Sequence, residues 1–228
     1  MKFHTVFAAV LALAGAASAN AVVVANLGAY TVSYDETTPG FGYMAYSFTS
    51  SGDVVGFAWQ VQPTVLVTSG GAPAMASFAM PDFTITPNPG WTLSGAVTGS
   101  LGNLVFNEFL GATTTATASA SVSVDGGPSV PSGGALAKVV TTTVPGFLSA
   151  GFYAGTTAVP VGAFSSFSFT GGLLTLTASG GPSSVIGQTQ NELKFSLFAT
   201  PVPEPETAAL MLAGLLTLGS LARRRGRG

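Results

Sequence analysis

The sequence predicts an all-β protein, built as an antiparallel β-sandwich or a jelly roll. Three observations support this fold class. Polar and apolar residues alternate with a period of two in many short stretches, which are rich in β-branched and aromatic side chains. Gly-rich or Pro-containing breaks separate most of these stretches. Between the two chain ends, no stretch shows the sustained 3.6-residue period of an amphipathic helix.

The expected strands follow one another along residues 20–201, which we assign to a single passenger domain. Many short strands with frequent turns are typical of a fold with two packed sheets. The expected strands are 29–34, 43–49, 54–61, 64–68, 83–86, 91–98, 104–110, 113–124, 137–144, 147–153, 164–170, 173–178 and 193–198.

Residues 113–124 are the longest of these stretches, and in their second half small apolar residues alternate with hydroxyls. The stretch ends at Asp125-Gly126, and Gly, Pro and Ser residues follow as far as Gly134. We therefore expect a long hairpin between 113–124 and 138–144, joined by an exposed loop of about nine residues.

The N-terminus is typical of a secretory signal peptide. Lys2 and His4 provide a positive start, 6–13 is an unbroken apolar run, and Ala17-Ser18-Ala19 places small residues where signal peptidase requires them. The apolar run is shorter than the roughly 17 residues needed to span a bilayer. We expect residues 1–19 to be cleaved after Ala19, with Ala17 and Ala19 as the recognised positions.

The C-terminus has three consecutive parts. Pro203, Glu204 and Pro205 form an extended segment, because proline fixes φ and prevents regular pairing. Residues 207–222 carry no charge and no proline, and predict one transmembrane helix about 24 Å long. Arg223-Arg224-Arg225 and Arg227 follow directly, and such a basic cluster holds its end of a membrane helix in the cytoplasm.

This three-part segment, residues 202–228, resembles the PEP-CTERM sorting domain of Gram-negative bacteria, which is also labelled an ice-binding protein C-terminal domain. The resemblance implies that Pro203, Glu204 and Pro205 are the sorting motif of an exosortase-type processing enzyme. It makes 207–222 a transient anchor in the inner membrane and Arg223, Arg224 and Arg225 the membrane stop. The processed protein is then expected at the outer surface or in the extracellular matrix, with exopolysaccharide as a further partner.

Composition excludes several function classes. The chain has 228 residues and no Cys, so it contains no disulfide, thiolate metal site or cysteine nucleophile. Its single histidine, His4, leaves with the signal peptide, which removes imidazole catalysis and histidine-based metal sites. A net charge of −2 argues against binding to nucleic acid. We expect no cofactor, no metal site and no catalytic residue.

Carboxylates are the remaining candidates for chemistry. Residues 20–202 hold seven acids against two lysines, a net charge of −5. Two opposed acids can hydrolyse a glycoside, but Asp35 and Glu36 are adjacent and point to opposite faces of a strand. The other acids stand alone, beside turns or strand ends, and Asp125-Gly126 favours a turn over a calcium ligand. We therefore predict a non-enzymatic protein; the alternative is a carbohydrate-binding or carboxylate-only hydrolytic module of the exopolysaccharide matrix.

Two further patterns leave alternatives open. Tyrosine and tryptophan side chains fit either a sugar-stacking platform or core packing, and threonine rows fit either exposed strand faces or an ice-binding surface. The aromatic residues are Tyr30, Tyr34, Tyr43, Tyr46, Trp59, Trp91 and Tyr153, and the threonine rows lie in 84–86, 113–117, 141–143 and 175–177.

Overall fold

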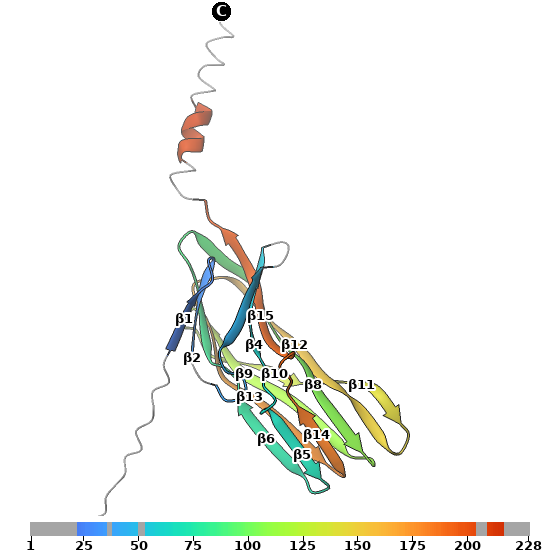
Figure 1. The fold of residues 1–228 in the computed structure, drawn as a ribbon. Coiled ribbons are helices and arrows are strands. Elements are labelled where there is room, and N and C mark those ends of the chain that lie inside the picture. The colour runs from blue at the N-terminus through green and yellow to red at the C-terminus, as the bar shows by residue number, and fades with distance from the viewer. Residues whose placement is uncertain (1–21, 36–37, 50–52, 204–208, 217–228) are drawn as a thin grey trace, which may run out of the picture.

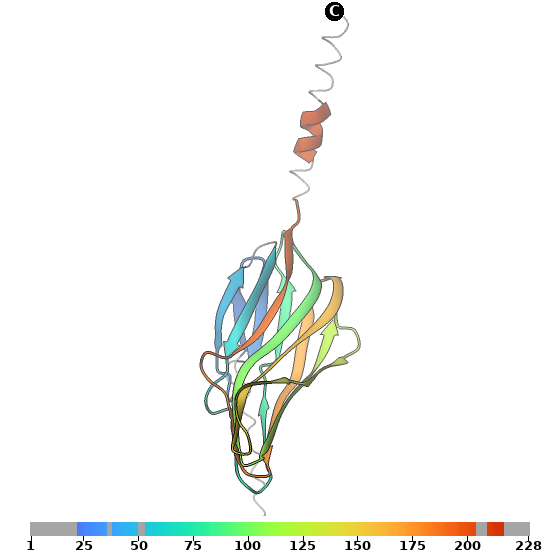
Figure 2. The same ribbon diagram turned by 90° about the vertical axis from the view of Figure 1, so that its right-hand side faces the viewer.

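The computed structural model describes residues 22–35, 38–49, 53–203 and 209–216. Two antiparallel sheets pack face to face, which confirms the predicted all-β class (Figure 1). The chain crosses between the sheets repeatedly, so neighbouring strands in space are often distant in sequence. Figure 2 shows the two layers after a quarter turn about the vertical axis.

The first sheet has seven strands. On β9 and β13 hydroxyl side chains such as Thr115 and Thr177 point outward, while Leu174 and Leu176 of β13 point into the core. In spatial order it consists of β1 (Val22–Asn26), β2 (Tyr30–Asp35), β7 (Phe83–Pro87), β13 (Phe167–Ser179), β9 (Thr113–Val124) and β10 (Val130–Ala135), and β6 (Ala74–Ala79) also pairs with β13.

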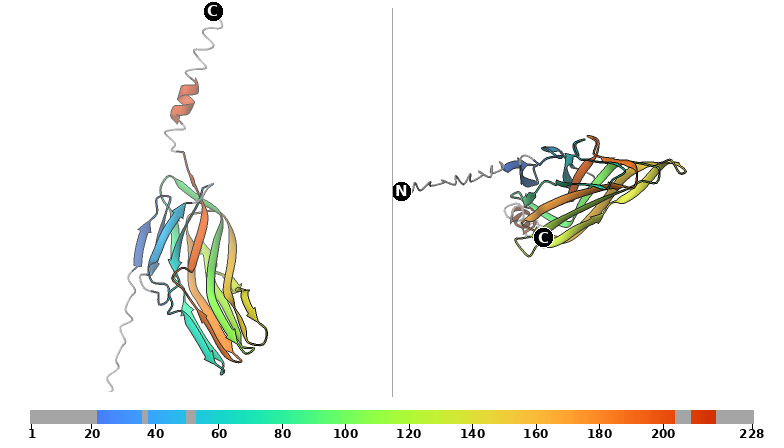
Figure 3. Two further views of the ribbon diagram at one scale, coloured as in Figure 1. Left: turned by 45° about the vertical axis from the view of Figure 1, so that its right-hand side comes forward. Right: turned by 90° about the horizontal axis from the view of Figure 1, so that it is seen from below.

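The second sheet has eight strands and contains the longest ones. In spatial order it consists of β11 (Ala137–Val144), β12 (Leu148–Phe164), β8 (Trp91–Phe109), β15 (Glu192–Pro201), β4 (Val54–Gln60) and β3 (Met44–Thr49), with β14 (Pro182–Ile186) paired to β8 and β5 (Leu66–Gly70) paired to β14. Figure 3 shows β11 at the side of the molecule opposite to β1 and β2.

Each expected strand overlaps an observed one, but some that we expected to be separate are continuous. The stretches 91–98 and 104–109 both belong to β8, and 173–178 continues 167–170 within β13, whereas Phe164 ends β12. Within β13 the register on β9 shifts between Thr170 and Leu173, so Gly171-Gly172 forms an irregularity inside a continuous strand. The strands β1, β6, β10 and β14 were not expected, because their short sequences lack a strong alternating pattern.

The predicted hairpin between 113–124 and 138–144 is wrong. Strand β9 pairs with β10, and β11 pairs with β12. Residues assigned to the loop, including Gly133, therefore form a strand. A Cβ atom on Gly133 would lie 2.2 Å from the backbone oxygen of Ala118, so the glycine permits close strand pairing rather than ending the strand.

An aromatic cluster fills the space between the sheets. Trp59 and Phe195 come from the eight-stranded sheet, and Phe83 and Phe169 come from the seven-stranded sheet. The rings of Phe83 and Phe195 are 4.5 Å apart at an interplanar angle of 66°, and Phe83 stacks on Phe169 at 5.1 Å. These geometries are the favoured ones for aromatic pairs, so the cluster joins the two sheets in one core.

Candidate functional site

The last strand leads directly into the predicted sorting segment. Pro201 ends β15 opposite Trp91, and the backbone nitrogen of Val202 donates a hydrogen bond to the oxygen of Gly90 at 2.8 Å. Pro203 is exposed. The body of the fold therefore ends immediately before the predicted motif, which leaves Pro203 accessible to another protein.

The predicted membrane helix 207–222 is described only in part. Residues 209–216 are helical and exposed at every position, and Leu212 belongs to them. No helix among the described residues combines the length and apolarity needed to cross a membrane.

One carboxylate lies inside the fold. Glu108 on β8 is 5% exposed and forms an ion pair with Lys138 on β11, with the nitrogen 2.5 Å from Oε1. The same oxygen accepts hydrogen bonds from the backbone nitrogen and hydroxyl of Thr114 at 2.6 and 2.7 Å. The Tyr153 hydroxyl also contacts Thr114. Three donors within a buried network therefore satisfy one oxygen of the Glu108 carboxylate.

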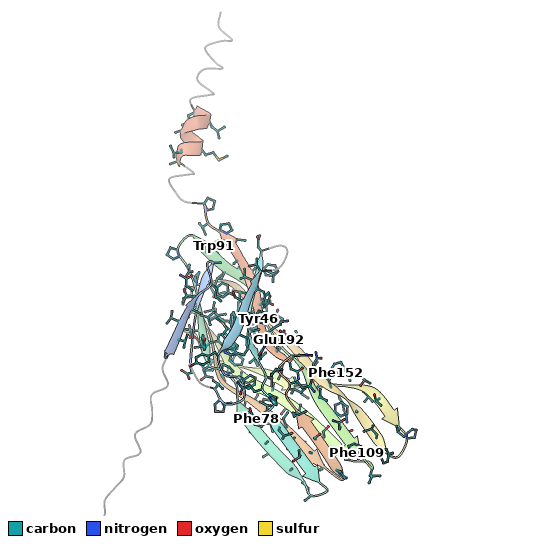
Figure 4. All side chains as sticks on the ribbon, in the orientation of Figure 1. Tyr46, Phe78, Trp91, Phe109, Phe152 and Glu192 are labelled. Carbon is teal, nitrogen blue, oxygen red and sulfur yellow. The ribbon has the colours of Figure 1, made fainter. Side chains whose placement is uncertain are left out.

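A second charged cluster lies on the outer face of the eight-stranded sheet. The Tyr46 hydroxyl donates a 2.5 Å hydrogen bond to Glu192, which also pairs with Lys194 (Figure 4). Burial raises the pKa of the Glu192 carboxyl, but the hydrogen bonds from Lys194 and Tyr46 outweigh it and hold that pKa below its usual value. Burial and the bond to Glu192 raise the pKa of Tyr46. The cluster therefore contains one ionised carboxylate, that of Glu192, and no second acid among the described residues that contact it.

Asp125 forms a turn, as the sequence predicts. Its Oδ1 accepts hydrogen bonds from the hydroxyl and backbone nitrogen of Ser165, both at 2.7 Å, and from the nitrogen of Ser166 at 2.8 Å. These bonds, chiefly the one from the Ser165 hydroxyl, lower the pKa of Asp125. In the described part of the chain, no three His, Cys, Asp or Glu side chains lie close enough to share a metal ion.

Most of the seven aromatic candidates pack in the core. Tyr30, Tyr34, Trp59 and Tyr153 are buried, whereas Tyr43 and Tyr46 are exposed. Burial also raises the pKa of Tyr30. The predicted choice between a sugar platform and core packing is thus resolved as core packing for these four residues.

Three of the four threonine rows share the outer face of the seven-stranded sheet. They lie on β7, β9 and β13, and their hydroxyls bond across the strands: Thr115 to Thr177 at 2.7 Å and Thr84 to Ser168 at 3.0 Å. The fourth row, 141–143, lies in the other sheet on β11. Rows 113–117 and 175–177 lie side by side, whereas row 84–86 pairs with β13 near Ser168, at the other end of that strand. The linear sequence does not reveal this pairing, because it brings together threonines that are far apart in the chain.

A polar depression lies on the outer face of the eight-stranded sheet and was missed entirely in the sequence analysis. Its volume is about 400 Å³, and Phe152 and Val105 supply its apolar surface. The polar run from Gln188 to Asn191, between β14 and β15, was the signal that could have identified it. Its side-chain hydrogen-bonding groups come from Asn103, Asn107, Thr141, Gln188, Gln190 and Asn191.

Comparison with known proteins then decides the nature of the C-terminal segment. Residues 201–226 match the family model of the PEP-CTERM protein-sorting motif. The chain carries a PEP-CTERM sorting motif. No curated protein matches the chain.

The PEP-CTERM match begins at Pro201, the last residue of the sandwich. It marks the chain as an exported protein that an exosortase sorts at the membrane. Of the predicted sorting and signal residues, the structure describes only Pro203. The other predicted residues, Ala17, Ala19, Glu204, Pro205, Arg223, Arg224 and Arg225, lie outside the described residues.

Proposed function

We propose that the chain is an exported, non-enzymatic β-sandwich protein, released by exosortase processing to the outer surface or the extracellular matrix. The observation that carries this proposal is the PEP-CTERM motif directly after the final strand. A cut near Pro203 would leave the strand pairing of β15 intact, since Val202 makes the last backbone bond to the body. The transient anchor would be residues 207–222, with Arg223–Arg225 in the cytoplasm.

The local partners of the described acids support a non-enzymatic role. Glu108 faces the core, whereas Glu192 lies on the outer side of the same sheet. Asp125 is engaged in its turn, and Asp82 accepts a bond from the Gly171 nitrogen at 2.8 Å. A carboxylate-only hydrolase needs two acids facing one substrate, and turnover of a polysaccharide that one Asp→Asn change abolishes would contradict our proposal.

Processing at the motif is tested by fractionation and intact-mass analysis. We expect Glu204→Ala to be translocated and then retained at full length in the inner membrane, because it removes the recognised charge and keeps the anchor. Leu212→Arg adds about 2.5–3.5 kcal/mol to membrane insertion and should release unsorted protein instead. Wild-type protein that still carries Arg227 at the cell surface or in the medium would make the tail a permanent anchor.

The sidedness of the chain is tested separately by reporter fusions. We expect a reporter at residue 200 to lie outside the cytoplasm and one at the C-terminus to lie inside it, because the basic residues after 207–222 stay cytoplasmic. Identical sidedness of the two fusions would refute the span.

Ice binding is a second candidate, favoured by the direct pairing of two threonine rows, 113–117 and 175–177, on one face. The spacing of outward residues along a strand is about 6.6–6.8 Å, which gives a regular array of hydroxyls. Thermal hysteresis measurements on the wild type and on Thr115→Ala/Thr177→Ala test it. Equal melting and freezing temperatures in the wild type would eliminate this candidate.

A further inference from the structure

We propose that the depression on the outer face of the eight-stranded sheet is a binding site for a neutral carbohydrate. This inference deepens the proposed function, because a polysaccharide matrix is where such a ligand occurs. The proposal rests on four features: the side chains that line the depression, the buried Nδ2 of Asn191 that has no partner among the described residues, the hydrogen bonds that hold residues 187–191, and the lack of charged lining residues.

The lining combines amide and hydroxyl groups with the ring of Phe152; the other lining phenylalanine, Phe106, is fully buried. Asn103, Asn107 and Gln190 each offer a donor and an acceptor, which is the combination that sugar hydroxyls require. Phe152, which lies opposite Val105 on the neighbouring strand, adds a half-buried apolar surface, and an aromatic ring of this kind packs against the C–H face of a sugar. A volume of about 400 Å³ falls within the range of ligand sites.

Asn191 provides the second observation. The residue is 3% exposed and lines the depression, yet its side-chain nitrogen Nδ2 has no hydrogen-bond partner among the described residues. A buried donor without a partner costs free energy. An acceptor oxygen brought by a ligand, once the side chains of the turn adjust to admit it, would remove this cost.

The turn that carries Asn191 is fixed to the body. The Gly187 nitrogen bonds to the Val65 oxygen at 2.8 Å, and the Val61 nitrogen bonds to the Asn191 oxygen at 3.0 Å. The Asn191 nitrogen also bonds to the Gln188 oxygen at 2.8 Å, across the turn itself. Because the backbone is held in place beforehand, little conformational entropy would be lost on binding.

The charge distribution selects a neutral ligand. No charged side chain lines the depression. Residues 20–202 contain no arginine, and their two lysines, Lys138 and Lys194, are both ion-paired with glutamates. An acidic polysaccharide would find no free cation in this region and would meet a net charge of −5. The absence of a carboxylate among the lining residues also favours binding over hydrolysis at this position.

The test is affinity electrophoresis of the protein recovered from producing cells, in gels containing a neutral glucan or mannan or, for comparison, a polyuronate. We expect retardation by at least one neutral glycan and none by the polyuronate. Phe152→Ala and the exposed Gln190→Ala should each weaken binding about tenfold. The matched control is Phe198→Ala, an exposed phenylalanine on the same sheet that does not line the depression.

Three results would overturn the proposal: retardation by no neutral glycan, retardation by the polyuronate alone, or unchanged binding in Phe152→Ala and Gln190→Ala. Unfolding midpoints of the variants, measured in parallel, separate lost binding from lost folding, and Gln190→Ala covers the case in which Phe152→Ala does not fold. Tail processing is scored in the same preparations by mass. Binding with an unprocessed tail would refute the sorting proposal alone, and processing without binding would refute the carbohydrate site alone.

Discussion

Glu108 and Lys138 show how a single ion pair is accommodated within an apolar fold. The carboxylate is buried, and three donors from Lys138 and Thr114 share one oxygen. The lysine also lies 4.6 Å from the centre of the Phe106 ring, so the ring faces a cation. A buried polar network of this kind stabilises the fold only when each of its donors and acceptors has a hydrogen-bond partner.

Glu108→Gln should lower the free energy of unfolding by about 2 kcal/mol. Breaking an ion pair in which both charges are fully buried costs about 3–5 kcal/mol. The expected loss here is smaller because the Lys138 side chain is 33% exposed, so water can solvate its charge once the partner is gone. Urea unfolding measures the change. Adding Lys138→Met should recover part of the loss because it removes the unpaired charge, and a double variant less stable than the single one would contradict this explanation.

The hydrogen bonds to Asp125 predict a pH-dependent contribution to stability at acid pH. Because the folded pKa is lowered below the unfolded value of about 3.9, the contribution is fully present above that value. It is lost as the pH falls through the folded pKa. Unfolding midpoints between pH 2 and 6 should therefore fall less steeply with acid in Asp125→Asn than in the wild type. Parallel curves for the two proteins would disprove the assignment.

At the scale of elements, glycines determine how strands pair. Strand β10 lies against β9 because Gly133 has a φ of 116° and no side chain to meet the Ala118 carbonyl. The next residue, Gly134, has nothing within 4 Å of an added Cβ. The two neighbours therefore differ sharply in their tolerance of a side chain.

Gly133→Ala should destabilise the protein by about 1–3 kcal/mol, since it adds both a clash and backbone strain. Gly134→Ala, the matched control, should change the free energy of unfolding by less than about 0.5 kcal/mol. Hydrogen exchange should report faster opening of β9 and β10 in the first variant only. Equal stability of the two variants would show that the strands are not paired as described.

At the scale of the whole molecule, the sandwich and the sorting segment are separable. Pro201 is the last paired residue, and the described helix 209–216 is exposed throughout. The proposed processing therefore requires that the body keep its stability once the tail is removed.

A chain ending at Pro203 should unfold at the same urea midpoint as the full chain. A chain ending at Phe198 should be less stable by about 2 kcal/mol, because it loses the pairing of Ala199, Thr200 and Pro201 with β8. Thermal and urea unfolding of the two truncated chains measure this difference. A marked loss of stability in the Pro203 chain would mean that the tail contributes to the fold.

The sequence by itself determined the β class, most of the strands and the sorting motif. These features depend on neighbouring residues: alternation follows from the two-residue period of a strand, and Pro203-Glu204-Pro205 is read as a linear segment. The turn at Asp125 was also predictable from the sequence, because an Asp followed by a Gly favours a turn. The structure agrees, with a φ of 52° at Asp125.

Only the tertiary structure decided which strands pair and which side chains meet. We expected β9 to form a hairpin with β11, but it pairs with β10, because Gly133 allows close approach to the backbone of Ala118. The Glu108–Lys138 ion pair likewise joins residues on two different strands, β8 and β11. The polar depression likewise combines β8, β11, β12 and the turn before β15. Such contacts are invisible in a linear pattern, because antiparallel packing of two sheets brings together residues that the chain separates by tens of positions.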